Sequence, residues 1–244
     1  MKGYLLCLLL TFFFSCSSRE RATFNSKSIL IVIPKEFPIH FNDLSKVLMG
    51  LDQKGHSYDL VQLEGRKKLE FSSIGHSQNY FKSGASYKKA KETVEQAYRK
   101  SRKQIQSLSK YSGIIVPGVE AIDKNYCQDL ALRRMIKAMV KEGKLVGLMG
   151  FSSCLLNNSE IAKLLKGLKV TSFSKKELKE IEKRVLKRKL SYPLHSMFKK
   201  YGYQYFRGKE WYSYVVVDRN VITAQNYDSD EVFVKKYLLE LKRE

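Results

Sequence analysis

The stretch EGKLVGLMGFSSC, residues 142–154, decides how the rest of this sequence is interpreted. Residues 145–149 form a short apolar run suited to a buried parallel strand, and Gly150 interrupts it just before a helical pattern begins. A sharp strand-to-helix turn of this kind holds one residue at positive φ, so that its side chain projects beside free helix amides. Glycine adopts that backbone without steric cost, but it supplies no thiol or hydroxyl. The stretch therefore predicts the geometry of a nucleophile elbow that lacks its nucleophile.

Apolar runs and amphipathic stretches alternate on both sides of this turn. Strands are predicted at 29–33, 58–63, 112–116, 145–149 and 168–171. Helices are predicted at 43–54, 129–141, 152–165 and 230–241. Continuous apolar strands separated by helices indicate an α/β protein with a mostly parallel sheet and helices on both faces. Strands at 211–217 and 221–224, joined by Asp218-Arg219-Asn220, predict an antiparallel hairpin at the sheet edge.

Positive charge is concentrated in two segments that interrupt this pattern. The chain has 45 Lys and Arg against 24 Asp and Glu, a net charge of +21. Residues 65–110 hold 12 basic and 3 acidic side chains, and residues 174–200 hold 10 and 3. The first segment predicts a six-turn surface helix with a narrow stripe at Tyr87, Ala90, Val94, Ala97, Ser101, Ile105 and Leu108. The second predicts one or two basic helices with a stripe at Leu178, Ile181 and Val185.

The N-terminus has the pattern of a bacterial lipoprotein signal. Lys2 precedes an apolar run at 4–14, and a small residue then precedes Cys16, which would carry the acyl chains, such as palmitate. An uncleaved anchor or a plain secreted protein are the alternatives. We therefore expect a signal peptide at 1–15, a tether at 16–27, and a single domain at 28–244 with insertions at about 65–110 and 174–200.

Two cysteines, Cys127 and Cys154, remain in the domain. They fall in different predicted helices, and a domain of this size does not need a covalent link. We expect two buried free thiols rather than a disulfide. The cysteines and the four histidines show no metal-ligand spacing, so neither a metal nor another cofactor is expected.

Five strings in this order resemble the DJ-one/PfpI superfamily, which includes the parkinsonism-associated deglycase and intracellular proteases and is class-I glutamine-amidotransferase-like. The strings are ILIVIPKEF with GHSYDLV, YSGIIVPG, EGKLVGLMG, LLKGLKVTSF, and VVVDRNVITAQN before a final helix. They cover most of residues 29–241 outside the two basic insertions. The resemblance implies a flavodoxin-like three-layer α/β/α sandwich.

The sequence departs from this family at its reactive site. Gly150 matches the position of the family's cysteine, and Phe151 matches the residue after it. The family's acidic partner falls on Pro38, or on Glu36 or His40 if the alignment slips by two residues. A carboxylate there would help to set the protonation of the thiol, so its loss fits the loss of the cysteine.

Other residues near the turn offer a displaced nucleophile. Ser152 and Ser153 fall in the first helical turn, where serine commonly caps a helix. Cys154 lies one turn beyond Gly150 and is interpreted as a core thiol, with a displaced nucleophile as the alternative. His195 is interpreted as a surface residue, and a Cys154–His195 dyad has no support in the sequence.

A pocket is expected to persist at the turn. The amides of Gly118, Gly150 and Phe151 would converge above the sheet, with Glu36 nearby, and could hold a small anion or acyl group. The sequence therefore favours a non-catalytic, lipid-anchored pseudoenzyme of the bacterial envelope, facing the periplasm or the exterior. The alternatives are a cysteine- or serine-dependent hydrolase or glyoxalase-like enzyme, and a chaperone-like protein partner.

The basic helices at 85–108 and 175–190 favour an anionic surface as partner. Solvated helix faces are the alternative explanation for their charge. Nucleic acid is not expected, because the basic runs lack interleaved base-stacking aromatics. A homodimer is expected from the resemblance, unless the insertions block that interface.

Overall fold

The computed structural model describes residues 28–34, 37–63, 69–72, 81–101, 105, 107–120 and 123–243. In this part of the chain no helix is long and apolar enough to cross a membrane. The predicted signal peptide, the tether and Cys16 lie outside the described residues.

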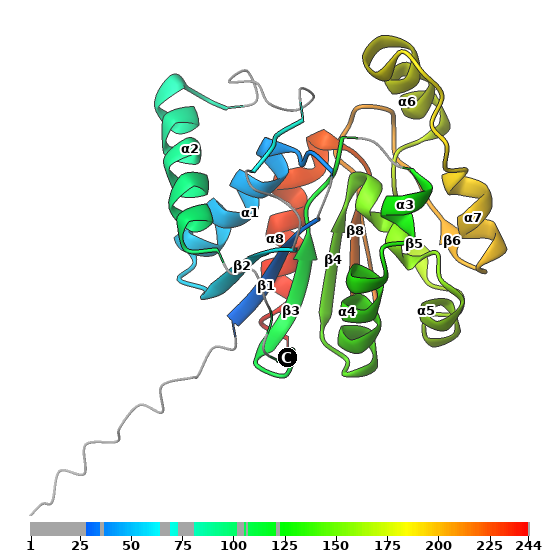
Figure 1. Cartoon of the computed structure of the whole chain (residues 1–244), viewed down its shortest axis with the longest axis horizontal. Coiled ribbons are helices and arrows are strands. Elements are labelled where there is room, and N and C mark those ends of the chain that lie inside the picture. The colour runs from blue at the N-terminus through cyan, green and yellow to red at the C-terminus, as the bar shows by residue number, and fades with distance from the viewer. Residues whose placement is uncertain are drawn as a thin grey trace, which may run out of the picture.

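A six-stranded sheet in the order β2-β1-β3-β4-β8-β7 forms the centre of the molecule (Figure 1). All neighbouring strands are parallel except the edge pair β7 and β8, so the predicted hairpin is confirmed. Its turn contains Arg219 at φ 52°. The strands are β1 (Ser28–Ile33), β2 (Tyr58–Gln62), β3 (Tyr111–Val116), β4 (Leu145–Met149), β7 (Val215–Asp218) and β8 (Val221–Ala224).

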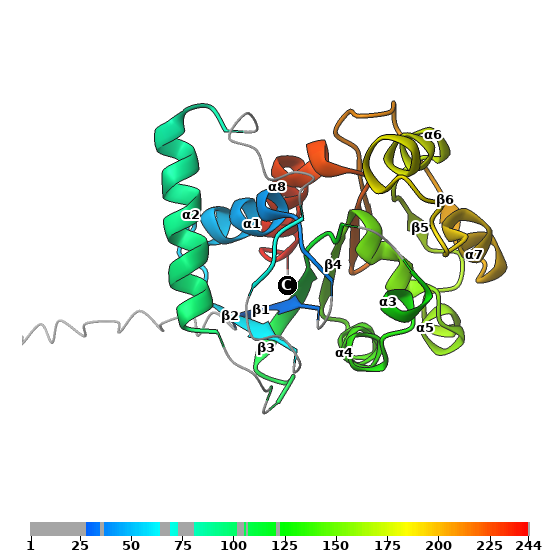
Figure 2. The same cartoon turned by 45° about the horizontal axis from the view of Figure 1, so that its top comes forward.

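Helices cover both faces of the sheet, which confirms the flavodoxin-like sandwich (Figures 1 and 2). α1 (Phe41–Gln53) and α8 (Asp230–Glu240) lie on one face, and α4 (Leu130–Lys141) lies on the other with α3 (Lys124–Cys127) and α5 (Ser159–Leu164). The sheet has a glycine, Gly147, where α8 crosses it. A Cβ there would lie 2.6 Å from Cζ of Phe233, so glycine allows α8 to pack closely against β4.

The first basic insertion forms a shorter helix than its sequence pattern predicts. α2 (Gly84–Arg99) begins at an N-cap in which Ser83 accepts from the amide of Ser86, and it packs outside α1 through Ala90, Val94 and Ala97. The predicted extension to Leu108 is wrong. Ile105 and Leu108 contact the core although neither is part of the helix. Apolar residues at three- and four-residue steps do not by themselves distinguish a continuing helix from non-helical residues that pack on the core.

The second insertion builds a small subdomain beside β7. β5 (Lys169–Val170) pairs with β6 (Gln204–Tyr205) in a separate two-stranded sheet, so the strand predicted at 168–171 does not extend the main sheet. Between them lie α6 (Lys175–Glu180), a π-helical turn η3 (Ile181–Leu186) and α7 (Leu194–Lys200). Val185, predicted in the apolar stripe, is 38% exposed, whereas Ile181 is buried, so the stripe does not continue along the π-helical turn.

Two further predicted boundaries are corrected. The strand predicted from 211 begins only at Val215, because Trp211 has a φ of 59° that a strand does not accommodate. The helix predicted at 152–165 is divided into a 3₁₀-helix, η2 (Gly150–Leu156), and α5, with Asn158 capping the second piece. A second 3₁₀-turn, η4 (Tyr227–Ser229), leads into α8.

Cys127 and Cys154 form a disulfide, so the prediction of two free thiols is wrong. The short α3 packs against η2 and brings the two Cα atoms to 5.4 Å, although 27 residues separate them in sequence. Both cysteines are fully buried.

We expect this disulfide to contribute about 3–4 kcal/mol, since it removes the conformational entropy of a closed loop from the unfolded chain. The double variant Cys127→Ser, Cys154→Ser should show a correspondingly lower free energy of unfolding in urea. Adding reductant to wild type should reproduce the loss and leave the variant unchanged. Equal stability of the oxidised wild type and the variant would contradict this expectation.

Candidate functional site

The predicted elbow is present at the carboxyl end of β4. Every residue of β4 is buried, and Gly150 follows it with a φ of 52°, the left-handed conformation that glycine adopts without strain. The helix that begins there is η2, a 3₁₀-helix instead of the predicted α-helix. The backbone geometry of a nucleophile elbow is therefore retained at a residue without a side chain.

Aromatic rings occupy the space in front of Gly150. A Cβ on Gly150 would lie 3.0 Å from Cε2 of Phe173, a residue from the entry to the second insertion. The Phe173 ring also lies 4.4 Å from the ring of Phe151 and 4.9 Å from that of Tyr227, between centroids. With Trp211, these rings form what we call the aromatic plug: Phe151, Phe173, Trp211 and Tyr227.

Side-chain hydrogen bonds to backbone carbonyls hold the plug against the elbow. The Ser172 hydroxyl donates to the carbonyl of Gly150 at 3.0 Å. The carbonyl of Phe173 lies 2.9 Å from Nε2 of His195 and accepts from the Tyr205 hydroxyl at 3.3 Å. The position of Phe173 is thus fixed from both sides by partners in the elbow and in the second insertion.

Glu177 also fixes the segment that carries Phe173. Its buried carboxylate accepts from the amide of Ser174 at 2.6 Å and from the amide of Trp211 at 2.8 Å. The side chains of Asn226 and Gln225 donate to it at 2.6 and 3.1 Å. A buried carboxylate is tolerated where several donors compensate its desolvation, so this residue joins three separate segments at one point.

The two serines of the elbow are committed to structural hydrogen bonds. Ser152 donates to the carbonyl of Pro117 at 2.6 Å and lies 2.6 Å from the hydroxyl of Tyr126. Ser153 donates to the carbonyl of Gly150 at 2.9 Å. Both lie inside the 3₁₀-helix, so the prediction that one of them caps the helix is wrong. Burial raises the pKa of Tyr126, which leaves Ser152 beside a phenol and a carbonyl, neither of which is a general base.

The remaining candidate nucleophile and base are separately engaged. Cys154 is bonded to Cys127 and has no thiol in this state. His195 is partly buried, and its ring lies 4.7 Å from that of Tyr205, so it is not the surface residue predicted. Burial lowers its pKa, and its Nε2 faces the carbonyl of Phe173. The structure does not join Cys154 and His195 into a dyad.

The loop after β1 contributes no carboxylate to the elbow among its described residues. Glu36 lies outside the described residues. Pro38 uses its carbonyl to accept the amide of Glu120 at 2.9 Å. The amide of Gly118, predicted to face a ligand, donates to Oδ2 of Asp43 at 3.0 Å. The carboxyl group of Asp43 therefore already accepts the hydrogen bond of one of the amides that were expected to bind an anion.

Asp43 belongs to a buried polar cluster that the sequence analysis missed. Burial raises the pKa of Asp43 well above its usual range, the neighbouring Asp230 raises it further, and burial raises the pKa of Asp230 to about 6. Burial lowers the pKa of His40 to about 3, and neither of its ring nitrogens has a hydrogen-bond partner among the described residues. Nδ1 of His40 lies 3.9 Å from Oδ2 of Asp43, and burial favours the neutral form of each group. The spacing of His40 and Asp43 at the start of α1 was the available signal.

No group of three or more His, Cys, Asp or Glu side chains within the described ranges could hold a metal ion. The arrangement at the elbow offers neither a free nucleophile nor a base positioned beside one among these residues.

The chain belongs to the DJ-1/PfpI family, whose model matches residues 27–240. No curated protein matches the chain in sequence. The fold, the order of the strands and the elbow after β4 agree with this assignment.

Solved structures share the fold at low sequence identity. The Francisella tularensis Rapid Encystment Protein 24 kDa is 19% identical, with a TM-score of 0.73 over 88% of this chain and 99% of that one. Glyoxalase III from Candida albicans is 13% identical, with a TM-score of 0.73 over 88% and 97%. Drosophila melanogaster DJ-1beta is 15% identical, with a TM-score of 0.55 over 88% and 90%.

Restoring a cysteine at the elbow should not restore an accessible thiol. In Gly150→Cys the new Cβ would meet the ring of Phe173, and the left-handed backbone would cost about 1–2 kcal/mol. Iodoacetamide labelling at position 150, resolved by peptide mass mapping, should be slow. Adding Phe173→Ala should accelerate it at least tenfold. Equally fast labelling in the single variant would show that the plug does not close the elbow.

The carboxyl of Asp230 should destabilise the folded protein at neutral pH. Its folded pKa of about 6 exceeds its ordinary value of 3.8, so its contribution to stability is fully present below pH 3.8 and is lost as the pH rises through 6. We expect Asp230→Asn to be more stable than wild type at pH 8, by on the order of 1–3 kcal/mol, and not at pH 4.

Urea unfolding at both pH values measures this difference. Glu92→Gln, on the exposed side of α2, should follow the wild-type profile. A pH dependence in Asp230→Asn identical to that of wild type would refute the assignment.

Proposed function

We propose that this chain is a non-catalytic member of the DJ-1/PfpI family that acts by binding. The observation that carries the proposal is the elbow itself, where the position matching the family's cysteine is Gly150 and the ring of Phe173 fills the space in front of it. The rival reading, an enzyme with a displaced nucleophile, would need Cys154, which is in a disulfide, or Ser152, which donates to a carbonyl. The glyoxalase III named above is a different protein at 13% identity.

The second insertion supplies the binding surface in this proposal. All ten Lys and Arg side chains between 174 and 200 are exposed. The three glutamates of the segment are used inside the fold: Glu177 is buried, Glu180 accepts from the Trp211 indole at 3.0 Å, and Glu182 accepts from the amide of Leu190 at 2.9 Å. The carboxylates that could neutralise this surface are thereby turned inward.

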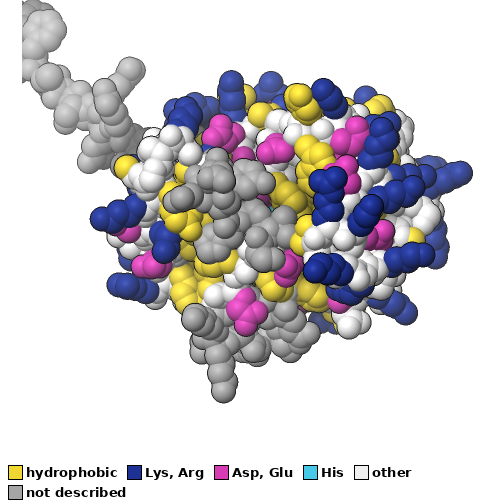
Figure 3. Space-filling view, turned by 90° about the horizontal axis from the view of Figure 1, so that it is seen from above, with side chains coloured by type: hydrophobic (Ala, Val, Ile, Leu, Met, Phe, Trp, Pro, Cys, Tyr) yellow, Lys and Arg dark blue, Asp and Glu magenta, His cyan; other side chains and the backbone are white. Residues whose placement is uncertain are grey.

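Figure 3 looks onto the end of the molecule that is uppermost in Figure 1, and Lys and Arg side chains gather there over the side of α6 and α7. We call the exposed basic residues of 174–200 the basic face. No ion pair between described residues involves a member of this face. An unneutralised cluster of this kind favours an anionic partner over a merely solvated helix.

The partner in this proposal is an anionic surface of the bacterial envelope, with the chain held near it by a lipid on Cys16. Each lysine close to a negatively charged membrane contributes on the order of 1 kcal/mol, within a screening distance of about 10 Å. Exposed lysines on α2, including Lys88, Lys89 and Lys91, would add to this attraction. Homodimer formation stays a prediction.

Turnover assays test the absence of catalysis. Wild type, Cys154→Ala and Ser152→Ala should all convert methylglyoxal and peptide substrates at the rate of buffer alone. Activity in wild type that either variant abolishes would support the enzyme reading instead.

Vesicle co-sedimentation tests the basic face. The full chain carrying Cys16→Ser, and so without lipid, should bind anionic vesicles more tightly than zwitterionic ones, with a steep loss as salt increases. Replacing Lys183, Arg184, Lys187 and Arg188 by Gln should reduce the anionic preference at least tenfold.

A matched variant with Gln at Lys124, Arg134, Lys141 and Lys163 removes the same charge from the α3–α5 side and should bind as wild type does. Equal losses in the two variants would mean that total charge, and not this face, governs binding.

A further inference from the structure

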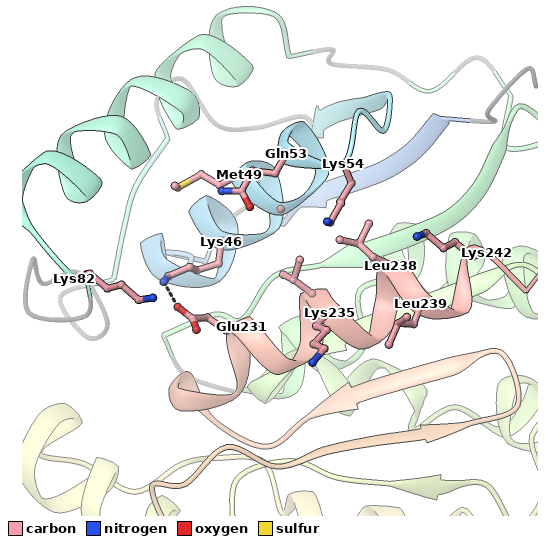
Figure 4. Close-up of a pocket in the computed structure, with 12 residues that line it drawn as sticks. Lys46, Met49, Gln53, Lys54, Lys82, Glu231, Lys235, Leu238, Leu239 and Lys242 are labelled. Atoms are coloured by element: carbon pink, nitrogen blue, oxygen red, sulfur yellow. Dashed lines mark hydrogen bonds and ion pairs between the residues drawn. The ribbon is translucent and has the colours of Figure 1, made fainter. Parts of the chain in front are cut away.

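A groove of about 620 Å³ lies between α1 and α8, away from the elbow. This volume is in the range of small-molecule sites. Its apolar lining comes from both helices, with Met49 on α1 and with Val234, Leu238 and Leu239 on α8. Figure 4 shows the two helices and the lining side chains.

Part of the groove floor stays exposed, although Leu238 belongs to the buried core. α8 has apolar residues on two faces: Phe233 and Tyr237 are buried under the sheet, whereas Leu239 is 49% exposed. α1 meets α8 at Gly50, where a Cβ would collide with the Val234 side chain, so the helices approach closely at that point and leave the groove along the rest of their contact. Exposed apolar surface of this kind gains free energy when an apolar ligand covers it.

Lysines surround this floor and outnumber the acids. Lys46 pairs with Glu231 at 2.6 Å, and this contact together with Lys82 lowers the pKa of Glu231. The other lining lysines, Lys54, Lys235 and Lys242, make no ion pair with a described residue. The lining of the groove therefore holds five lysines and one carboxylate, and that carboxylate, Glu231, is already paired with Lys46.

The charges are placed at two ends of the groove. Lys46, Lys82 and Glu231 lie together at one end, and Lys54 and Lys242 lie toward the other end together with Leu238 and Leu239 (Figure 4). Lys54 lies eight positions after Lys46, which corresponds to about 12 Å along the helix axis. The end at Lys54 and Lys242 has no acidic residue among its described lining residues.

We propose that this groove binds a single-chain amphiphile with an anionic head, such as a fatty acid or an alkyl phosphate. The head lies between Lys54 and Lys242, and the alkyl chain lies over Leu238, Leu239 and Met49. Charge complementarity selects the sign of the head, and the apolar floor requires a tail. This site is separate from the basic face and does not depend on the proposed function.

Isothermal titration of the full chain with dodecyl phosphate, below its critical micelle concentration, tests the proposal. We expect saturable binding with one site that Lys54→Gln, Lys242→Gln weakens by on the order of tenfold. Leu239→Gln should weaken it as well, because it places an amide on the floor. The matched double variant Lys183→Gln, Arg188→Gln, on the basic face, should bind as wild type does.

Inorganic phosphate should bind at least tenfold more weakly than dodecyl phosphate, and dodecyltrimethylammonium should not compete with it. Equal binding of the cationic amphiphile, or identical titrations for wild type and Lys54→Gln, Lys242→Gln, would overturn the proposal. So would binding to anionic phospholipid vesicles through these two lysines without binding of the monomeric amphiphile, because the ligand would then be a membrane headgroup.

Discussion

The aromatic plug in front of Gly150 depends on one buried carboxylate, that of Glu177. Glu177 caps α6 through the amide of Ser174 and binds the chain at Trp211 and at Asn226. Its hydrogen-bond donors within the described part of the chain are backbone amides and the side-chain amides of Gln225 and Asn226, so neutral donors compensate its burial. Such an arrangement is costly to disturb, because the loss of a donor leaves part of a desolvated charge unmatched. Phe173 directly precedes Ser174, so the hydrogen bond between Ser174 and Glu177 also restricts where Phe173 can lie.

The elbow keeps the backbone geometry of a nucleophile elbow, with a glycine at the residue where the strand ends and the helix begins. Gly150 adopts the left-handed conformation at the junction of β4 and η2. The space that a side chain and a ligand would share is filled by Phe173, and the neighbouring amide of Gly118 is bonded to Asp43. Side chains of the protein itself therefore fill the front of the elbow, and Ser152, Ser153 and Cys154 beside it are all engaged in other interactions.

The sequence was sufficient for the sheet and for the glycine turn after β4, since both depend on local patterns. β1, β3 and β4 are continuous apolar runs, and Gly150 is identified by its place after one of them. The end of α2 was missed because Ile105 and Leu108 continue a helical period without being helical. The disulfide and the plug were missed for a different reason: Cys127 meets Cys154, and Phe173 meets Gly150, through tertiary packing that separations of 27 and 23 residues do not reveal.

The disulfide has a consequence for the order in which this site is completed. Both Cys127 and Cys154 precede Phe173 in the chain, whereas the plug needs residues as far as Tyr227. During synthesis from the N-terminus, the segment that fixes the back of the elbow is complete before the residues that cover its front have been made. The back of the elbow and its cover are therefore supplied by different parts of the chain: the disulfide that holds it from behind is complete at Cys154, and the rings that close its front come from Phe173 onward.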